Sequence, residues 1–148
     1  MQEKISFWRI LGAGILYAIV AQVINTLGAF LSMGYYLMEE YFPVWSKVMM
    51  PVAGPPPSSF YAYSIGFGVL SGMLFALVYS VIKSGVPGRT AVKKGLVYGL
   101  LVFLVAGIPS SLMLYLLIYL PAGLIGIWSV SSLIAYLISG VIAAKICK

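Results

Sequence analysis

The sequence has no histidine, no aspartate and a single cysteine, and its only acidic residues are three glutamates. Without these residues the chain cannot form an internal disulfide, a zinc site of histidines and cysteines, or a histidine-ligated haem. Ser-His-Asp and Cys-His catalysis are excluded for the same reason. We therefore expect a protein that is not an enzyme, with no metal site and no cofactor.

Charge is also scarce, because 8% of the 148 residues are charged, whereas a soluble domain has about 25%. Hydrophobic residues make up 62% of the chain. So few charges cannot cover a water-facing surface, and we predict a single all-α membrane domain over residues 1–148. The net charge of +6 would suit nucleic acid, but the basic residues lie where membrane topology places them. We expect no nucleic-acid partner.

Four apolar runs are long enough to cross a bilayer, which takes about 20 residues of helix. Residues 1–9 precede a run longer than the apolar core of a signal peptide, so we interpret the first run as an uncleaved span. Uninterrupted runs of this length are helical and not barrel-like. The predicted spans are residues 10–31, 60–82, 95–119 and 124–144.

The basic residues predict the orientation, since loops rich in Lys and Arg stay in the cytoplasm. Only Lys47 lies on the other side of the predicted membrane, beside Glu39 and Glu40. We therefore expect a multi-pass protein of the cell membrane with both termini in the cytoplasm. The eight cations on the cytoplasmic side are Lys4, Arg9, Lys83, Arg89, Lys93, Lys94, Lys145 and Lys148.

The loop between the second and third spans holds four of these cations: Lys83, Arg89, Lys93 and Lys94. Two roles stay open for them. They fix topology alone, or they also bind anionic lipid, at about 1 kcal/mol for each cation near the surface.

The outer connection over residues 37–59 is long, and the one over residues 120–123 is short. Phe42, Trp45, Val48 and Met49 repeat at helical spacing, which predicts a turn or two of amphipathic helix lying in the interface. Pro55, Pro56 and Pro57 predict a stiff extended entry into the second span. With the short connection, the pattern predicts two helical hairpins.

An internal duplication is one interpretation of two similar motifs. Gly14-Ile-Leu-Tyr17 lies near the start of the first span, and Gly95-Leu-Val-Tyr98 begins the third. Two hairpins of the same orientation would be parallel repeats. The alternative is chance similarity between two apolar sequences.

Small residues recur every four positions in two spans and predict close helix packing, the main attraction between helices in lipid. Because the short basic loop joins these two spans, we expect them to be antiparallel neighbours that pack through these stripes. The partner stripe could also belong to another subunit. The residues are Ser64, Gly68, Gly72, Ala76 and Ser80 in the second span, and Gly95, Gly99 and Gly107 in the third.

Three spans carry uncharged polar residues at a similar depth, roughly 18–24 Å from the cytoplasmic side at 1.5 Å per residue. Proline in this group leaves the Val105 carbonyl without a main-chain donor. One interpretation is a pocket or pathway for a neutral or weakly polar solute; the other is interhelical hydrogen bonding, at roughly 0.6 kcal/mol per bond. The candidates are Gln22, Asn25, Thr26, Pro109, Ser110, Ser111, Ser129, Ser131 and Ser132.

The segment from Pro87-Gly-Arg-Thr-Ala-Val-Lys-Lys-Gly-Leu-Val-Tyr-Gly99 into Ala106-Gly-Ile-Pro109 resembles the central region of small four-span prokaryotic membrane proteins of unknown function. The resemblance implies a four-span fold and carries over no catalytic residue. The chain lacks the membrane-embedded glutamate of small multidrug exporters and has no fluoride-channel-like motif.

Three functions remain as hypotheses. The first is a non-catalytic accessory subunit or packing scaffold that contacts another membrane protein or a second copy, within the lipid bilayer. The second is a small oligomeric channel or carrier that uses the polar residues. The third is a lipid- or quinone-related membrane enzyme. No charged residue lies inside the spans, which argues against proton pumping and voltage sensing.

Overall fold

The computed structural model describes residues 6–52 and 54–147, and every regular element among them is helical. Four stretches are long and apolar enough to cross a membrane. This confirms the all-helical fold and the four predicted spans, and each predicted boundary lies within four residues of the observed one. The elements are α1 (Phe7–Leu31), α2 (Met33–Tyr36), η1 (Glu39–Val44), α3 (Ser58–Ile82), α4 (Ala91–Val102), η2 (Phe103–Gly107), α5 (Ile108–Leu117) and α6 (Ala122–Ile146).

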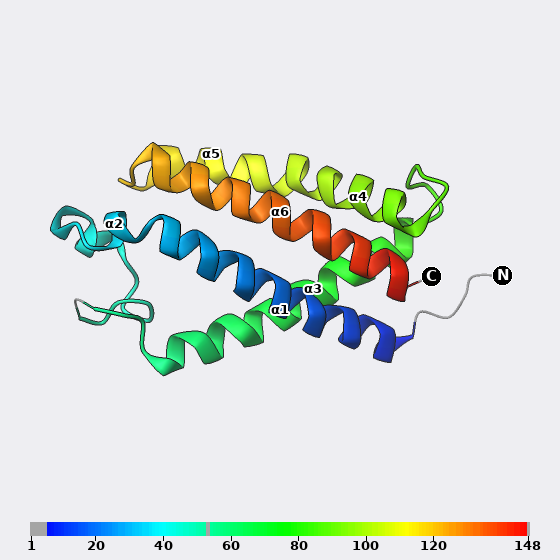
Figure 1. Ribbon diagram of the computed structural model, residues 1–148, viewed down its shortest axis with the longest axis horizontal. Helices are drawn as coiled ribbons and strands as arrows, with labels where there is room; N and C mark the ends of the chain where they lie inside the picture. Colours follow the sequence, from blue (N-terminus) through cyan, green and yellow to red (C-terminus); the bar gives the residue numbers. More distant parts are fainter. Residues whose placement is uncertain (1–5, 53, 148) are drawn as a thin grey trace.

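The long helices run along the long axis of the molecule, as Figure 1 shows. Extensive contacts join α1 to α3, α4 to α6, and α1 to α6. We call the end that holds the Lys83–Lys94 loop the basic end, and the end that holds residues 32–52 and 54–57 the opposite end. α3 crosses α1 obliquely, so these two helices are far apart at the opposite end (Figure 1).

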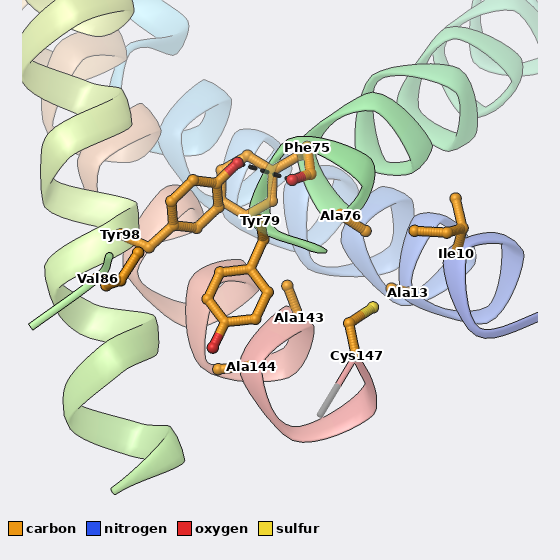
Figure 2. Packing of buried hydrophobic residues seen from close by; sticks show 10 residues of the cluster. All are labelled: Ile10, Ala13, Phe75, Ala76, Tyr79, Val86, Tyr98, Ala143, Ala144 and Cys147. Atoms are coloured by element: carbon orange, nitrogen blue, oxygen red, sulfur yellow. Dashed lines mark hydrogen bonds between the residues drawn. The ribbon is translucent and has the colours of Figure 1, made fainter. Parts of the chain in front are cut away.

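The largest buried cluster lies at the basic end, where α1, α3, α4 and α6 meet (Figure 2). Tyr98 of α4 is 1% exposed, and its hydroxyl donates a hydrogen bond to the main-chain carbonyl of Phe75 over 2.7 Å. The rings of Phe75 and Tyr79 lie 4.7 and 5.2 Å from that of Tyr98. Tyr98 therefore links α4 to α3, which otherwise share little contact.

The small-residue stripe of α3 packs against α1 and not against α4, which corrects the predicted pairing. A Cβ atom added to Gly72 would lie 2.5 Å from Cβ of Tyr17, and one added to Gly68 would lie 3.1 Å from Cβ of Ala18. Ser64 extends this contact with a hydrogen bond to Gln22. Shape complementarity to α1 therefore outweighs the proximity in sequence that the short basic loop gives to α4.

Two further residues of the α3 stripe have other roles. Ala76 is 1% exposed and belongs to the buried cluster at the basic end. Ser80 is half-buried and donates its hydroxyl hydrogen bond to the carbonyl of Ala76, within the same helix.

The stripe of the third span packs against α6. Gly95 and Gly99 meet the main chain of α6, and a Cβ on Gly99 would lie 2.7 Å from the carbonyl carbon of Tyr136. Gly107 does not belong to this seam, because a Cβ there would collide with the ring of Phe103 in its own span. This glycine instead leaves room for the ring of Phe103.

The long connection differs from the predicted interfacial helix. A 3₁₀ helix covers Glu39–Val44, and Trp45 after it is extended. A single turn follows, in which Met49 N–H bonds to the Ser46 carbonyl over 3.0 Å. Pro43 inside the 3₁₀ helix has no N–H to donate, so the helical spacing from Phe42 to Met49 does not become an α-helix.

Candidate functional site

The predicted polar residues do not form one site, because they lie at three separate contacts between helices. In the contact of α1 with α3, Ser64 Oγ donates to Gln22 Oε1 over 3.1 Å, and Gln22 Nε2 lies 3.5 Å from Thr26 Oγ1. These groups satisfy one another, as interhelical hydrogen bonds do in membrane proteins. This part of the predicted set joins two helices.

The second contact lies between α5 and α6. Ser129 Oγ donates to Ser111 Oγ over 2.5 Å, and Ser111 Oγ donates to the Gly107 carbonyl over 2.9 Å. Ser132 lies nearby in sequence and is half-buried. The two hydroxyls thus form a short chain of hydrogen bonds that ends on the carbonyl of the last π-helix residue.

The third contact lies between α1 and α6. Ser131 is 8% exposed, and its Oγ occupies the place beside Gly28, 2.7 Å from where a glycine Cβ would be. One turn further along α1, Ser32 is 1% exposed and donates its hydroxyl to the Gly28 carbonyl over 2.7 Å. Gly28 therefore admits a close approach of α6 at this level.

The other predicted residues point away from the bundle. Asn25, Thr26, Pro109 and Ser110 are exposed. Asn25 and Ser110 make no hydrogen bond to any residue in the part of the chain that the structure describes. An amide or hydroxyl in hydrocarbon without a partner is costly. These two side chains are the unsatisfied polar groups of the predicted set.

The third span changes from α-helix to π-helix before Pro109. Ile108 N–H bonds to the Phe103 carbonyl, five residues back. Pro109 has no N–H, so the Leu104 carbonyl loses the donor five residues on and the Val105 carbonyl loses the donor four residues on. One of these two carbonyls therefore lacks a donor of its own. Their side chains are 48% and 75% exposed.

The cations of the basic loop hold helix ends together. Lys83 Nζ donates to the carbonyl of Cys147 over 3.3 Å, and Lys94 Nζ donates to the carbonyl of Lys83 over 3.1 Å. A lysine at a helix C-terminus satisfies orphan carbonyls and complements the helix dipole. Thr90 caps α4 by accepting from Lys93 N–H over 3.2 Å, and Arg89 beside it is exposed. Binding of anionic lipid here stays a prediction.

The aromatic cluster at the opposite end was not predicted from the sequence, although Trp and Tyr residues are common anchors at membrane interfaces. Trp128 Nε1 donates to the Tyr36 hydroxyl over 3.0 Å. The ring of Trp45 lies 5.0 Å from that of Tyr36 and 6.2 Å from that of Trp128. Contacts this distant in sequence leave no local pattern that could have identified them.

Tyr41 lies at the same end of the molecule, and its environment predicts that stability falls at high pH. A hydrogen bond to the Glu40 side chain, then burial and the nearby charge, raise the pKa of Tyr41 to about 12. Its ring lies 5.8 Å from that of Tyr119, which follows α5. Because the pKa is raised, the stabilisation is fully present below pH ~10, the ordinary pKa, and is lost as the pH rises through about 12.

The difference in tyrosinate absorbance between the wild type and Tyr41→Phe reports the ionisation of Tyr41. We expect this difference to rise near pH 12. A Tyr41 signal that rises near pH ~10, the ordinary pKa of tyrosine, would contradict the hydrogen bond.

A shallow apolar groove of about 310 Å³ lies between α1 and α3 toward the basic end. Its lining contains no group for acid–base or metal chemistry. The apolar side chains suit contact with a hydrocarbon chain. Among the described residues, no group of three or more His, Cys, Asp or Glu side chains could hold a metal ion. The groove is lined by Phe7, Ile10, Leu70, Met73, Leu74 and Leu77.

Comparison with known proteins gives no match to a family model, to a curated protein or to a solved structure.

Proposed function

We propose that this chain is a non-catalytic accessory subunit of a membrane assembly, and that its third span docks against a different membrane protein. The support comes from the surface that the bundle leaves uncovered. In its most apolar stretch the third span has 6% of its residues buried, against 22%, 22% and 28% for the other three. α5 itself has no buried residue.

The single observation that carries the proposal is the acceptor that Pro109 creates on this bare surface. A carbonyl of Leu104 or Val105 lacks a main-chain donor, and the Ser110 hydroxyl beside it lacks a partner among the described residues. In lipid, broken backbone pairing is tolerated where neighbouring helices restore the missing bonds. A partner helix with a donor at this depth would satisfy the carbonyl.

The partner in this proposal is a different protein, because a carbonyl is an acceptor only. In a two-fold pair of copies, residues at the same depth face one another, so the carbonyl of one copy would face the same carbonyl of the other. The main chain of neither copy would supply the missing donor, which leaves only the Ser110 hydroxyl. A partner whose span presents a hydroxyl or amide at this level fits better.

The proposed orientation has both termini and the Lys83–Lys94 loop in the cytoplasm of a cell-membrane protein. It rests on the eight-to-one distribution of Lys and Arg over the two sides. The lysine contacts to the helix ends are compatible with it.

We also propose that the two halves form duplicated hairpins. Each Gly-x-x-Tyr motif places its glycine carbonyl against a glycine of the helix that packs on it. A Cβ on Gly72 would lie 2.8 Å from the Gly14 carbonyl oxygen, and a Cβ on Gly140 would collide with the Gly95 carbonyl oxygen. The same contact in both halves favours a repeat over chance similarity.

The docking proposal is tested with Pro109→Ala, which restores the missing N–H and removes the free acceptor. We expect co-purification of the partner from native membranes to fall about 3- to 20-fold, as one membrane hydrogen bond is lost. The variant should be at least as stable as the wild type, which separates docking from folding. Ser110→Ala should also weaken co-purification without loss of stability.

A photo-crosslinking amino acid in place of Ser110 tests directly which molecule contacts this position. The control position is Phe67, which is 65% exposed on α3. We expect one protein crosslinked at Ser110 and only lipid at Phe67. Equal crosslinking at both positions, or wild-type co-purification in both Pro109→Ala and Ser110→Ala, would contradict the proposal. Crosslinks to lipid with solute flux in vesicles would instead favour the channel hypothesis.

A further inference from the structure

Asn25 is an unsatisfied amide on a different face from the docking surface proposed above. It lies within the membrane-spanning helix α1, three residues after Gln22, whose hydrogen bond to Ser64 links α1 to α3. Beyond that point α3 diverges from α1 toward the opposite end (Figure 1). Asn25 is exposed and makes no hydrogen bond to the described residues.

The surroundings of Asn25 allow another helix to approach closely. Ala21 and Ala29 lie one turn before and one turn after it on the same face of α1, and both are half-buried. Small residues on either side let two helix backbones come near enough for an amide to bond across them. α3 does not cover this site, since Asn25 itself is exposed.

The chemistry of the amide favours a second copy of this chain as the occupant. A primary amide donates through its nitrogen and accepts through its oxygen, so two amides related by a two-fold axis satisfy each other with two hydrogen bonds. Copies that insert in the same orientation place their Asn25 residues at the same depth. An unrelated partner would need its own polar residue at that level.

We infer that the Asn25 face of α1 is the interface of a two-fold homodimer, in which the two Asn25 side chains hydrogen-bond to each other between flanking alanines. The interface is isologous, so each copy contributes the same patch. It is independent of the third-span docking surface, and the two can be occupied at once.

The test measures association of the full-length chain in lipid vesicles by energy transfer between labelled copies, over a dilution series of protein in lipid. We expect a two-state monomer–dimer equilibrium in the wild type. Asn25→Leu should weaken it about tenfold, as two membrane hydrogen bonds are lost. Asn25→Gln keeps the amide and should weaken it less. Because Asn25 bonds to none of the described residues, Asn25→Leu should not lower the thermal stability of the monomer.

Cysteine crosslinking locates the contact. In a Cys147→Ser background, Ala29→Cys should form a disulfide-linked dimer under oxidation, and adding Asn25→Leu should sharply lower its yield. Ile19→Cys is the matched control, because Ile19 is 54% exposed elsewhere on α1. Any of three results overturns the inference: a dimer whose dissociation constant is unchanged by Asn25→Leu, equal crosslinking through Ile19, or a stoichiometry other than two. Crosslinking of Ala29→Cys only to a different protein in native membranes also overturns it.

Discussion

Gly99→Ala is expected to force α4 away from α6 and to lower the free energy of unfolding in detergent micelles by about 1–3 kcal/mol, the usual cost of overpacking. The added methyl group would lie 2.7 Å from the carbonyl carbon of Tyr136 and 2.9 Å from Cα of Leu137. These are main-chain atoms of a helix, so no rotamer change can relieve the collision. Denaturant titration monitored by helical circular dichroism measures the loss.

The matched control is Gly126→Ala, in the helix that Gly99 contacts. A Cβ atom there meets nothing within 4 Å. Because alanine is the better helix former by up to ~1 kcal/mol in water, this variant should be as stable as the wild type or slightly more stable. Equal losses in the two variants would mean that α4 and α6 do not pack through Gly99.

The existence of these close contacts could be predicted from the sequence, but the partner of each stripe could not. The four-residue spacing of small side chains predicts that a helix backbone comes close to Gly72 and another to Gly99. The choice of partner depends on complementary surfaces, such as Tyr17 against Gly72 and Tyr136 against Gly99. These positions are distant in sequence, and nothing local marks them as a pair.

For the polar residues, the depth in the membrane could be predicted from the sequence, but the direction in which each side chain points could not. Counting residues along the spans placed Gln22 and Asn25 at one level. Their directions could not be predicted, because the oblique crossing of α3 covers Gln22 and leaves Asn25 exposed. The proline at 109 indicated a missing hydrogen bond to the Val105 carbonyl, yet it gave no sign that the preceding residues Phe103–Gly107 would form a π-helix.

Tyr98→Ala is expected to destabilise the protein by about 2–4 kcal/mol, because Tyr98 is the buried link between α4 and α3. Its side chain is 1% exposed and packs against Phe75 and Tyr79. In water, truncation of a large aromatic residue costs about 3–5 kcal/mol, from lost transfer energy and from the cavity left behind. In a membrane the transfer part is smaller, since lipid is itself apolar, and the cavity and lost contacts remain.

Two comparisons separate the packing of Tyr98 from its hydrogen bond. Tyr98→Phe removes only the hydroxyl that donates to the Phe75 carbonyl, and should cost about 0.5–1.5 kcal/mol. Tyr115→Ala removes a ring of the same type that is 59% exposed on α5, and should cost little. If Tyr98→Phe were as harmful as Tyr98→Ala, the hydrogen bond and not the ring would hold α4 to α3. If Tyr98→Ala resembled Tyr115→Ala, the contacts of α6 with α1 and α4 would be sufficient to join the halves of the bundle without it.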